Sequence, residues 1–302
     1  MGWRLTRSPV PNPRSPMFHK YHALGNDYLI LDPAQQTGAM ARGLTPAQVV
    51  TICDRHRGVG SDGIVYGPLA EESRPCHFAC EIWNPDGSMA EVSGNGLRIF
   101  ARYLMDAGYV SLEETSTCVL RSGGREIPIF YGDRPDASIR VELGRASIAS
   151  GPVTLPPDLL VSLGPATLVD VGNPHCVFFP AVPIDEALAR RWGPLVESHS
   201  AFPQRTNVQF VRVIDTHTVA IEIWERGAGY TQASGSSSCA AALAAIQRNG
   251  CLSPVTVQMA GGNLTVDVAF HADGWRVALT GPVTPVFTGH WILDEQHPIP
   301  NL

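Results

Sequence analysis

The sequence lacks the segments that mark a membrane protein or a nucleic-acid-binding protein. No run of 18 or more apolar residues occurs in the 302-residue chain, so we expect no membrane-spanning helix. Charged side chains make up only 17% of the residues and the formal net charge is −6. No lysine- or arginine-rich block offers a footprint for phosphates. We therefore expect a globular protein with neither a nucleic-acid nor a membrane partner.

Cysteine is sparse, and its spacing does not predict a metal site. The chain has seven cysteines, and they do not form pairs, with each other or with histidines, at the spacing of a zinc ligand set. An odd number of thiols without such pairs is typical of reduced, mostly buried cysteines in a cytoplasmic protein. We expect a cytoplasmic location and no bound metal.

The first sixteen residues also lack a recognisable pattern. They carry three arginines and four prolines but no apolar stretch of the kind found in a secretory signal. We expect residues 1–16 to form a disordered extension and the folded part to begin at Met17.

One stretch of the chain occurs twice. Glu81-Ile82-Trp83 precedes Ser93-Gly94, and Glu222-Ile223-Trp224 precedes Ser234-Gly235. Both elements recur at the same offset, since 222 − 81 and 234 − 93 both equal 141. Each copy predicts a strand, a glycine-containing loop and a small-residue turn that opens a helix. The repeat predicts two similar halves, each of which brings one serine at a helix start to a shared site.

The helices predicted after these serines are nearly uncharged. Residues 97–107 place apolar side chains at helical spacing and end at Gly108, while residues 238–248 are alanine-rich and apolar nearly all round. A helix of the second kind is buried. Short strands separated by glycine and aspartate turns follow each helix. We expect each helix to be wrapped by the strands of its own half, with outer helices at 45–54 and 184–199.

The two helix starts are suited to an anion. Ser93-Gly94-Asn95-Gly96 and Ser234-Gly235-Ser236-Ser237 each present backbone N–H groups without an intrahelical partner. Such donors, together with the helix dipole, bind a carboxylate or a phosphate. Two converging ends would hold a small anionic substrate from both sides, although a serine N-cap alone is also a routine structural feature.

Polar residues at strand ends supply further candidates. Glu225 and Arg226 follow the second-copy strand, and they fit either a surface ion pair or the recognition of a substrate carboxylate by the guanidinium. His175 directly precedes a strand and fits either a structural role or acid–base chemistry. The asparagines at strand ends fit turns, or hydrogen-bonding groups for an amino-acid substrate. They are Asn26, Asn84, Asn173 and Asn207.

In these residues the sequence resembles the diaminopimelate epimerases, a family of cofactor-independent amino-acid racemases and epimerases. The resemblance extends from about residue 18 to residue 250. It is carried by six stretches: HALGNDY at 22–28, NPDGS at 84–88, GNGLR at 94–98, GNPH at 172–175, TNV at 206–208 and ERGAG at 225–229.

The resemblance implies an α/β (α+β) fold of two pseudo-symmetric domains, each a rolled mixed or antiparallel sheet around a central helix. We expect residues 17–146, completed by 283–302, to form one domain and 147–282 the other, with the active site in the cleft between them. The resemblance also implies a homodimer, no cofactor such as pyridoxal phosphate, and no metal. The substrate-binding residues that it implies are Asn26, Asn84, Gly94, Asn95, Asn173, Asn207, Glu225, Arg226, Gly235 and Ser236.

The chain departs from the family where the chemistry takes place. In the family each helix start carries a cysteine, one to remove the α-proton and the other to return it on the opposite face. Ser93 and Ser234 occupy these positions here. A serine hydroxyl is far less acidic than a thiol, so it needs an adjacent base. His175 and Glu225 are the candidates, as activators of the serines or as the bases themselves. Gly63 is a second departure, since many members carry a substrate-contacting glutamine there.

Three functions follow from this pattern. The first is an isomerase that transfers a proton at the α-carbon of an amino acid, such as LL- to meso-diaminopimelate in lysine biosynthesis, with Ser/His and Ser/Glu pairs in place of thiols. The second is a lyase, a dehydratase or another isomerase on the same scaffold. The third is an inactive amino-acid binder or an engineered Cys→Ser variant.

Overall fold

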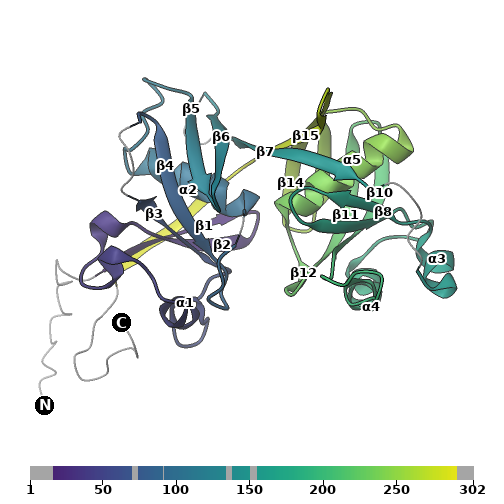
Figure 1. Ribbon diagram of the computed structural model, residues 1–302, viewed down its shortest axis with the longest axis horizontal. Coiled ribbons are helices and arrows are strands. Elements are labelled where there is room, and N and C mark those ends of the chain that lie inside the picture. Colours follow the sequence, from purple (N-terminus) through teal and green to yellow (C-terminus); the bar gives the residue numbers. More distant parts are fainter. Residues whose placement is uncertain (1–15, 70–73, 91, 134–137, 150–154, 291–302) are drawn as a thin grey trace, which may run out of the picture.

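The computed structural model describes residues 16–69, 74–90, 92–133, 138–149 and 155–290 (Figure 1). Except for Pro16, the predicted disordered extension lies outside the described residues. Residues 291–302 of the segment predicted to complete the first domain also lie outside them.

Strands form most of the described structure. The strands of the first half are β1 (Met17–Ala23), β2 (Asn26–Leu31), β3 (Ile64–Leu69), β4 (His77–Trp83), β5 (Thr117–Ser122), β6 (Arg125–Tyr131), β7 (Ile139–Ile148) and the late strand β16 (Thr284–His290). Those of the second half are β8 (Thr167–Asp170), β9 (Pro174–Phe178), β10 (Asn207–Asp215), β11 (Thr218–Glu225), β12 (Gly229–Thr231), β13 (Val255–Met259), β14 (Gly262–His271) and β15 (Gly274–Gly281).

The helices are fewer than the strands. The α-helices are α1 (Pro46–Cys53), α2 (Gly94–Asp106), α3 (Pro157–Leu163), α4 (Glu186–Glu197) and α5 (Gly235–Asn249), and two short 3₁₀ helices, η1 (Pro33–Gln35) and η2 (Met40–Arg42), follow β2. Helix α3 lies in a stretch for which the sequence analysis predicted no helix. It begins at a proline and buries Leu159 and Leu163 against β9 and β10.

One hydrogen-bonded sheet runs through both halves, in the order β15-β14-β13-β11-β10-β9-β8-β7-β6-β5-β4-β3-β2-β1-β16. Strand β15 also pairs antiparallel with β7. Within the described residues, the eight strands from β7 to β15, leaving out β12, therefore close into a barrel. Strand β7 joins the two halves, and the chain after β15 crosses back so that β16 pairs with β1 (Figure 1).

Each half surrounds one central helix. Helix α2 packs against β1, β2, β3 and β7, and α5 packs against β8, β9, β10, β11, β13, β14 and β15. Residues 240–245 of α5 are all 0% exposed. Small alanine side chains suit this position because the interior of an eight-stranded barrel is narrow. The predicted fold class is confirmed.

Side-chain caps fix where the central helices begin. The Oγ atom of Ser93 accepts a hydrogen bond from the N–H of Gly96, and that of Ser234 accepts one from the N–H of Ser237. Both helices therefore start three residues before the predicted starts at 97 and 238. Glycine and serine have low helix propensity, so periodicity alone missed a first turn that the caps stabilise.

Smaller apolar clusters cover the outside of each half. Helix α1 buries Val49 and Ile52 against β2 and β3, and α4 buries Ala189 and Val196 against β10. These outer helices leave the junction of the two halves uncovered, and the candidate site lies there.

Candidate active site

The N-termini of α2 and α5 meet at the junction of the two halves. Ser93 and Ser234 are their N-cap residues, and the glycines that follow them lie close together. A Cβ atom added to Gly235 would lie 3.7 Å from Cα of Gly94 and 2.9 Å from Cδ2 of Leu279. Glycine at both positions therefore allows the helices to approach end to end, so two sets of free N–H groups reach one site.

A cleft of about 1180 Å³ lies over these helix ends, with walls from both halves. Most of the predicted site residues line it: Asn26, Asn84, Ser93, Gly94, Asn95, Asn173, Glu225, Arg226, Ser234, Gly235 and Ser236. Two others, His175 and Asn207, are buried beside the cleft and do not line it.

Ser234 is paired with a carboxylate. Its hydroxyl donates a hydrogen bond to Oε2 of Glu225 at 3.2 Å, while its Oγ caps α5. Burial raises the pKa of Glu225, and the Asp62 carboxylate acts in the same direction. A carboxylate of raised pKa in contact with a serine hydroxyl is the arrangement that a general base requires.

Ser93 is paired with a phenol instead. Its Oγ lies 3.3 Å from the hydroxyl of Tyr28, on β2, and accepts the capping hydrogen bond from Gly96. Burial raises the pKa of Tyr28 to about 12, so the phenol is neutral at physiological pH. Among the described residues His175 is hydrogen-bonded to neither serine, because its Nε2 lies against Oδ1 of Asn173.

Gly63 explains how Tyr28 fits at this position. A Cβ atom at Gly63 would lie 2.5 Å from Cε1 of Tyr28 and 2.6 Å from the carbonyl oxygen of Trp83. A glutamine here would displace the tyrosine ring. The glycine that departs from the family pattern thus makes room for the ring that contacts Ser93.

A chain of amides connects a buried arginine with a carboxylate in the cleft wall. Arg98 donates to Oδ1 of Asn95 at 2.7 Å, Asn95 donates to Oδ1 of Asn26 at 2.9 Å, and Asn26 donates to Oδ2 of Asp62 at 3.0 Å. Arg55 closes the chain by donating to Oδ1 of Asp62 at 2.7 Å. Since each amide accepts on one side and donates on the other, the orientations of Asn26 and Asn95 are fixed.

Arg98 is fully buried at the base of this chain. It is 0% exposed, donates to the carbonyl of Gly94, and forms no ion pair among the described residues. Burial lowers its pKa to about 10, so the guanidinium still carries its charge at neutral pH. A positive charge therefore lies below the first turn of α2, where the helix dipole is also positive.

His175 and Asn207 hold other cleft residues in place. Nε2 of His175 lies 2.8 Å from Oδ1 of Asn173, and an amide oxygen requires this nitrogen to be the donor. Asn207 donates to the carbonyl of Pro174 and accepts from the N–H of Arg226. The two side chains thus orient Asn173 and the loop that begins at Arg226.

The buried imidazole of His175 predicts a pH-dependent stability. Burial lowers its pKa from 6.5 to about 3. Between pH 6.5 and pH 3 the imidazole is therefore protonated in the unfolded chain but neutral in the folded chain. The contribution of His175 to the free energy of unfolding is therefore fully present above pH 6.5, and it is lost as the pH falls towards 3. We expect His175→Gln to reduce the drop in unfolding free energy between pH 7 and pH 4 by about 3 kcal/mol.

Urea unfolding at the two pH values measures this effect. The exposed His56, changed to Gln, is the matched control. Equal pH dependence in the original chain and in His175→Gln would contradict the prediction.

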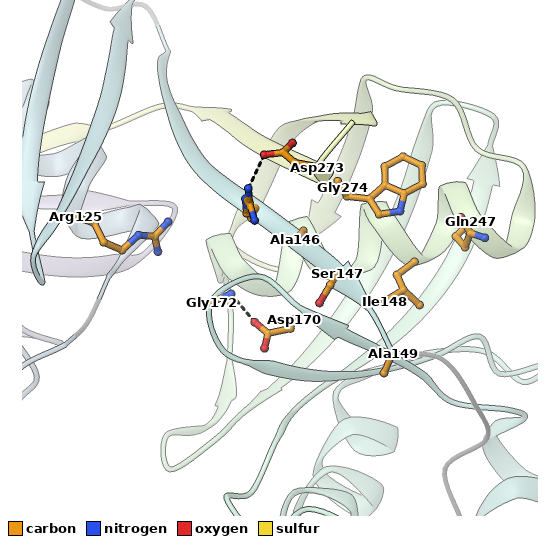
Figure 2. A pocket seen from close by; sticks show the side chains of 12 residues that line it. Arg125, Ala146, Ser147, Ile148, Ala149, Asp170, Gly172, Gln247, Asp273 and Gly274 are labelled. Carbon is orange, nitrogen blue, oxygen red and sulfur yellow. Dashed lines mark hydrogen bonds and ion pairs between the residues drawn. The ribbon is translucent and has the colours of Figure 1, made fainter. Parts of the chain in front are cut away.

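The remaining predicted residues lie at the rim of the cleft. Asn84 donates to Oγ of Ser88, and Arg226 is exposed and donates to the carbonyl of Gln204. Arg125, at the start of β6, adds a second positive charge there and donates to the carbonyl of Leu143 at 2.6 Å. Arg125 and Gly172 also border a neighbouring hollow of about 830 Å³ (Figure 2).

Sequence reasoning missed several residues of this site. Tyr28, Asp62, Arg98 and Arg125 were not predicted as site residues, although Tyr28 and Arg98 lie inside stretches that carry the family resemblance. The signal for Arg98 was its charge, since it is the one charged residue in the otherwise apolar run 97–101. Within the part of the chain that the structure describes, no group of three or more histidine, cysteine, aspartate or glutamate side chains could hold a metal. None of its helices is long and apolar enough to cross a membrane.

The family model for diaminopimelate epimerase matches residues 18–149 and 167–286. Diaminopimelate epimerase 2 of Nostoc sp. is 43% identical over 284 residues, which cover 90% of this chain and 94% of that protein. A diaminopimelate epimerase of Synechococcus sp. is 37% identical over 286 residues, covering 90% of this chain and 96% of the relative. The chain belongs to the diaminopimelate epimerase family. It is therefore a member of a family of isomerases.

Solved structures of lower sequence identity share the fold of this diaminopimelate epimerase family member. A PhzF-family phenazine biosynthesis protein of Bacillus anthracis has a TM-score of 0.69 at 15% identity, covering 92% of this chain and 99% of that one. A hydroxyproline epimerase of Agrobacterium vitis, with bound trans-4-hydroxy-L-proline, has a TM-score of 0.65 at 16% identity, covering 93% and 94%.

Proposed function

We propose that the protein inverts the α-carbon of an amino acid by proton transfer without a cofactor, and that LL-diaminopimelate is its substrate. One observation carries the proposal: Ser93 and Ser234, each the N-cap of a central helix, line one cleft where the two helix ends meet. The names of the relatives supply the substrate. The two relatives from Nostoc and Synechococcus are both named diaminopimelate epimerases, which gives no support to the lyase or the inactive binder.

The geometry supports the following roles for the residues of the cleft. The N–H groups at Gly94, Asn95, Gly235 and Ser236 hold the α-carboxylate and stabilise the negative charge that develops when the α-proton leaves. Ser93 and Ser234, which we propose stand where the family has cysteines, lie on the two faces of the α-carbon. Asn84, Asn173 and Arg226 bind the far end of the substrate at the rim.

Three further proposals rest on the family membership. We propose a domain boundary at 146/147 with 283–302 in the first domain, a homodimer, and a cytoplasmic location. Light scattering after size-exclusion chromatography tests the dimer, because a monomer has the 32.5 kDa mass of one chain.

Hydrogen exchange tests the function. We expect the protein to replace the α-hydrogen of LL-diaminopimelate by deuterium in D₂O and to form meso-diaminopimelate, as followed by proton NMR and chiral chromatography. Ser93→Ala together with Ser234→Ala is the control and should abolish both processes. No exchange with LL- or meso-diaminopimelate would overturn the proposed substrate, and no exchange across a panel of L-amino acids would overturn proton transfer.

A further inference from the structure

We propose that the two proton-transfer units of the cleft are unequal: Ser234 with Glu225 removes the α-proton, and Ser93 with Tyr28 returns one from the opposite face. Tyr28 is the positioning residue of the second unit. The inference rests on the proposed function and specifies which serine removes the α-proton and which serine returns one.

The partners of the two serines carry the inference. The hydroxyl of Ser234 donates to a carboxylate oxygen of Glu225, so its own proton has an acceptor 3.2 Å away. The hydroxyl of Ser93 has a phenol at 3.3 Å. A neutral phenol can give a proton to an oxygen but cannot accept one, whereas a carboxylate accepts one readily. The two units therefore start each turnover in opposite protonation states.

The absence of a side chain at Gly63 leaves the space in which the Tyr28 ring lies. The ring of Tyr28 occupies space that any side chain at Gly63 would take, since a Cβ atom there would lie 2.5 Å from Cε1. The residue pair keeps the Tyr28 hydroxyl at Ser93, and Tyr28 is only 6% exposed. Both carboxylates of the cleft wall, Glu225 and Asp62, further raise the pKa of Tyr28, which keeps its proton on the oxygen between turnovers.

The proton transfers balance. The bond between the α-carbon and its hydrogen breaks, the proton moves to Oγ of Ser234, and the proton of Ser234 moves to Oε2 of Glu225. The electron pair stays on the α-carbon until the proton of Ser93 forms a new C–H bond on the other face. The Tyr28 proton then moves to Oγ of Ser93, because a phenol is more acidic than an alkanol. Glu225 ends protonated and Tyr28 ends as phenolate, and transfer through water resets them.

The variant Tyr28→Phe distinguishes removal of the α-proton from delivery of a proton to the opposite face. It keeps the ring and deletes only the hydroxyl. We expect epimerisation to fall at least 100-fold while KM changes less than threefold. In D₂O, one of the two substrates, LL- or meso-diaminopimelate, should still exchange its α-hydrogen with retention of configuration. In that case Ser234 takes the α-proton and passes its own proton to Glu225, both groups exchange their protons with solvent, and Ser234 returns deuterium to the same face.

Tyr66→Phe is the matched control, since it removes a buried hydroxyl that donates to the carbonyl of Met40 outside the cleft. Unchanged epimerisation in Tyr28→Phe, or an equal loss of exchange with both substrates, would overturn the assignment of Tyr28 alone. Ser93→Ala should show the same exchange with retention, so a second variant tests the idea if Tyr28→Phe folds poorly. If the unmodified protein exchanges neither substrate, the proposed function fails and the assignment fails with it.

Discussion

Replacement of Glu225 by glutamine should lower kcat for epimerisation by a factor of about 10³ or more. The amide keeps the size of the side chain and an oxygen that accepts the hydrogen bond from Ser234. It cannot take up a proton, so the proton of Ser234 has no acceptor. Circular dichroism and thermal unfolding should show an intact fold, because the substitution leaves the shape of the site unchanged.

Glu225 should also determine how kcat/KM depends on pH on the acidic side of its optimum. Glu225 acts only when it is deprotonated, and burial raises its pKa above the usual 4.5. We therefore expect kcat/KM to rise with pH through this raised pKa, and the residual activity of Glu225→Gln to lack that rise. Glu222→Gln is the matched control. Glu222 lies on the same strand and accepts a hydrogen bond from Tyr230, and its pKa is also raised by burial, but it does not line the cleft. Equal losses in the two variants would contradict the assignment of Glu225.

Replacement of Arg98 by methionine should lower kcat/KM about 100-fold. The guanidinium is a fixed positive charge beneath the N–H groups proposed to hold the substrate carboxylate, and it orients Asn95. Its loss weakens the stabilisation of the charge that develops during proton removal. An apolar side chain of similar length also avoids the cost of burying a charge without an ion pair, so stability should change little.

Arg98→Lys completes this test. Lysine keeps the positive charge but has one nitrogen in place of the two with which Arg98 reaches Gly94 and Asn95, so we expect it to retain activity within about tenfold of the original chain. Steady-state kinetics and the denaturation midpoints of all three proteins provide the measurements. A merely structural arginine would instead make both variants lose activity in proportion to the fraction of unfolded protein.

The parts of this structure that depend on local sequence were predictable. The 141-residue repeat predicted two similar halves and two serines at helix starts, and both serines line one cleft. The alanine-rich run predicted a buried helix because so apolar a surface cannot face water. These predictions needed only periodicity and capping chemistry.

Contacts between distant segments were not predictable in the same way. The Tyr28–Ser93 contact joins residues 65 positions apart, and it depends on the small volume of Gly63 on a third segment. Likewise, the sequence left His175 open between a structural role and acid–base chemistry, and only the fold shows that its ring is buried against Asn173. Such pairings are set by how strands and loops come together, which the composition of any one segment does not encode.

The return of the last described strand has a consequence for synthesis on the ribosome. On its side facing away from β2, the first strand, β1, pairs with β16, whose residues are made more than 260 positions later. Until residues 284–290 emerge, that edge of the nascent sheet lacks its native partner and exposes backbone groups that favour pairing with other chains. The first half therefore cannot be completed until all strands of the second half have been made.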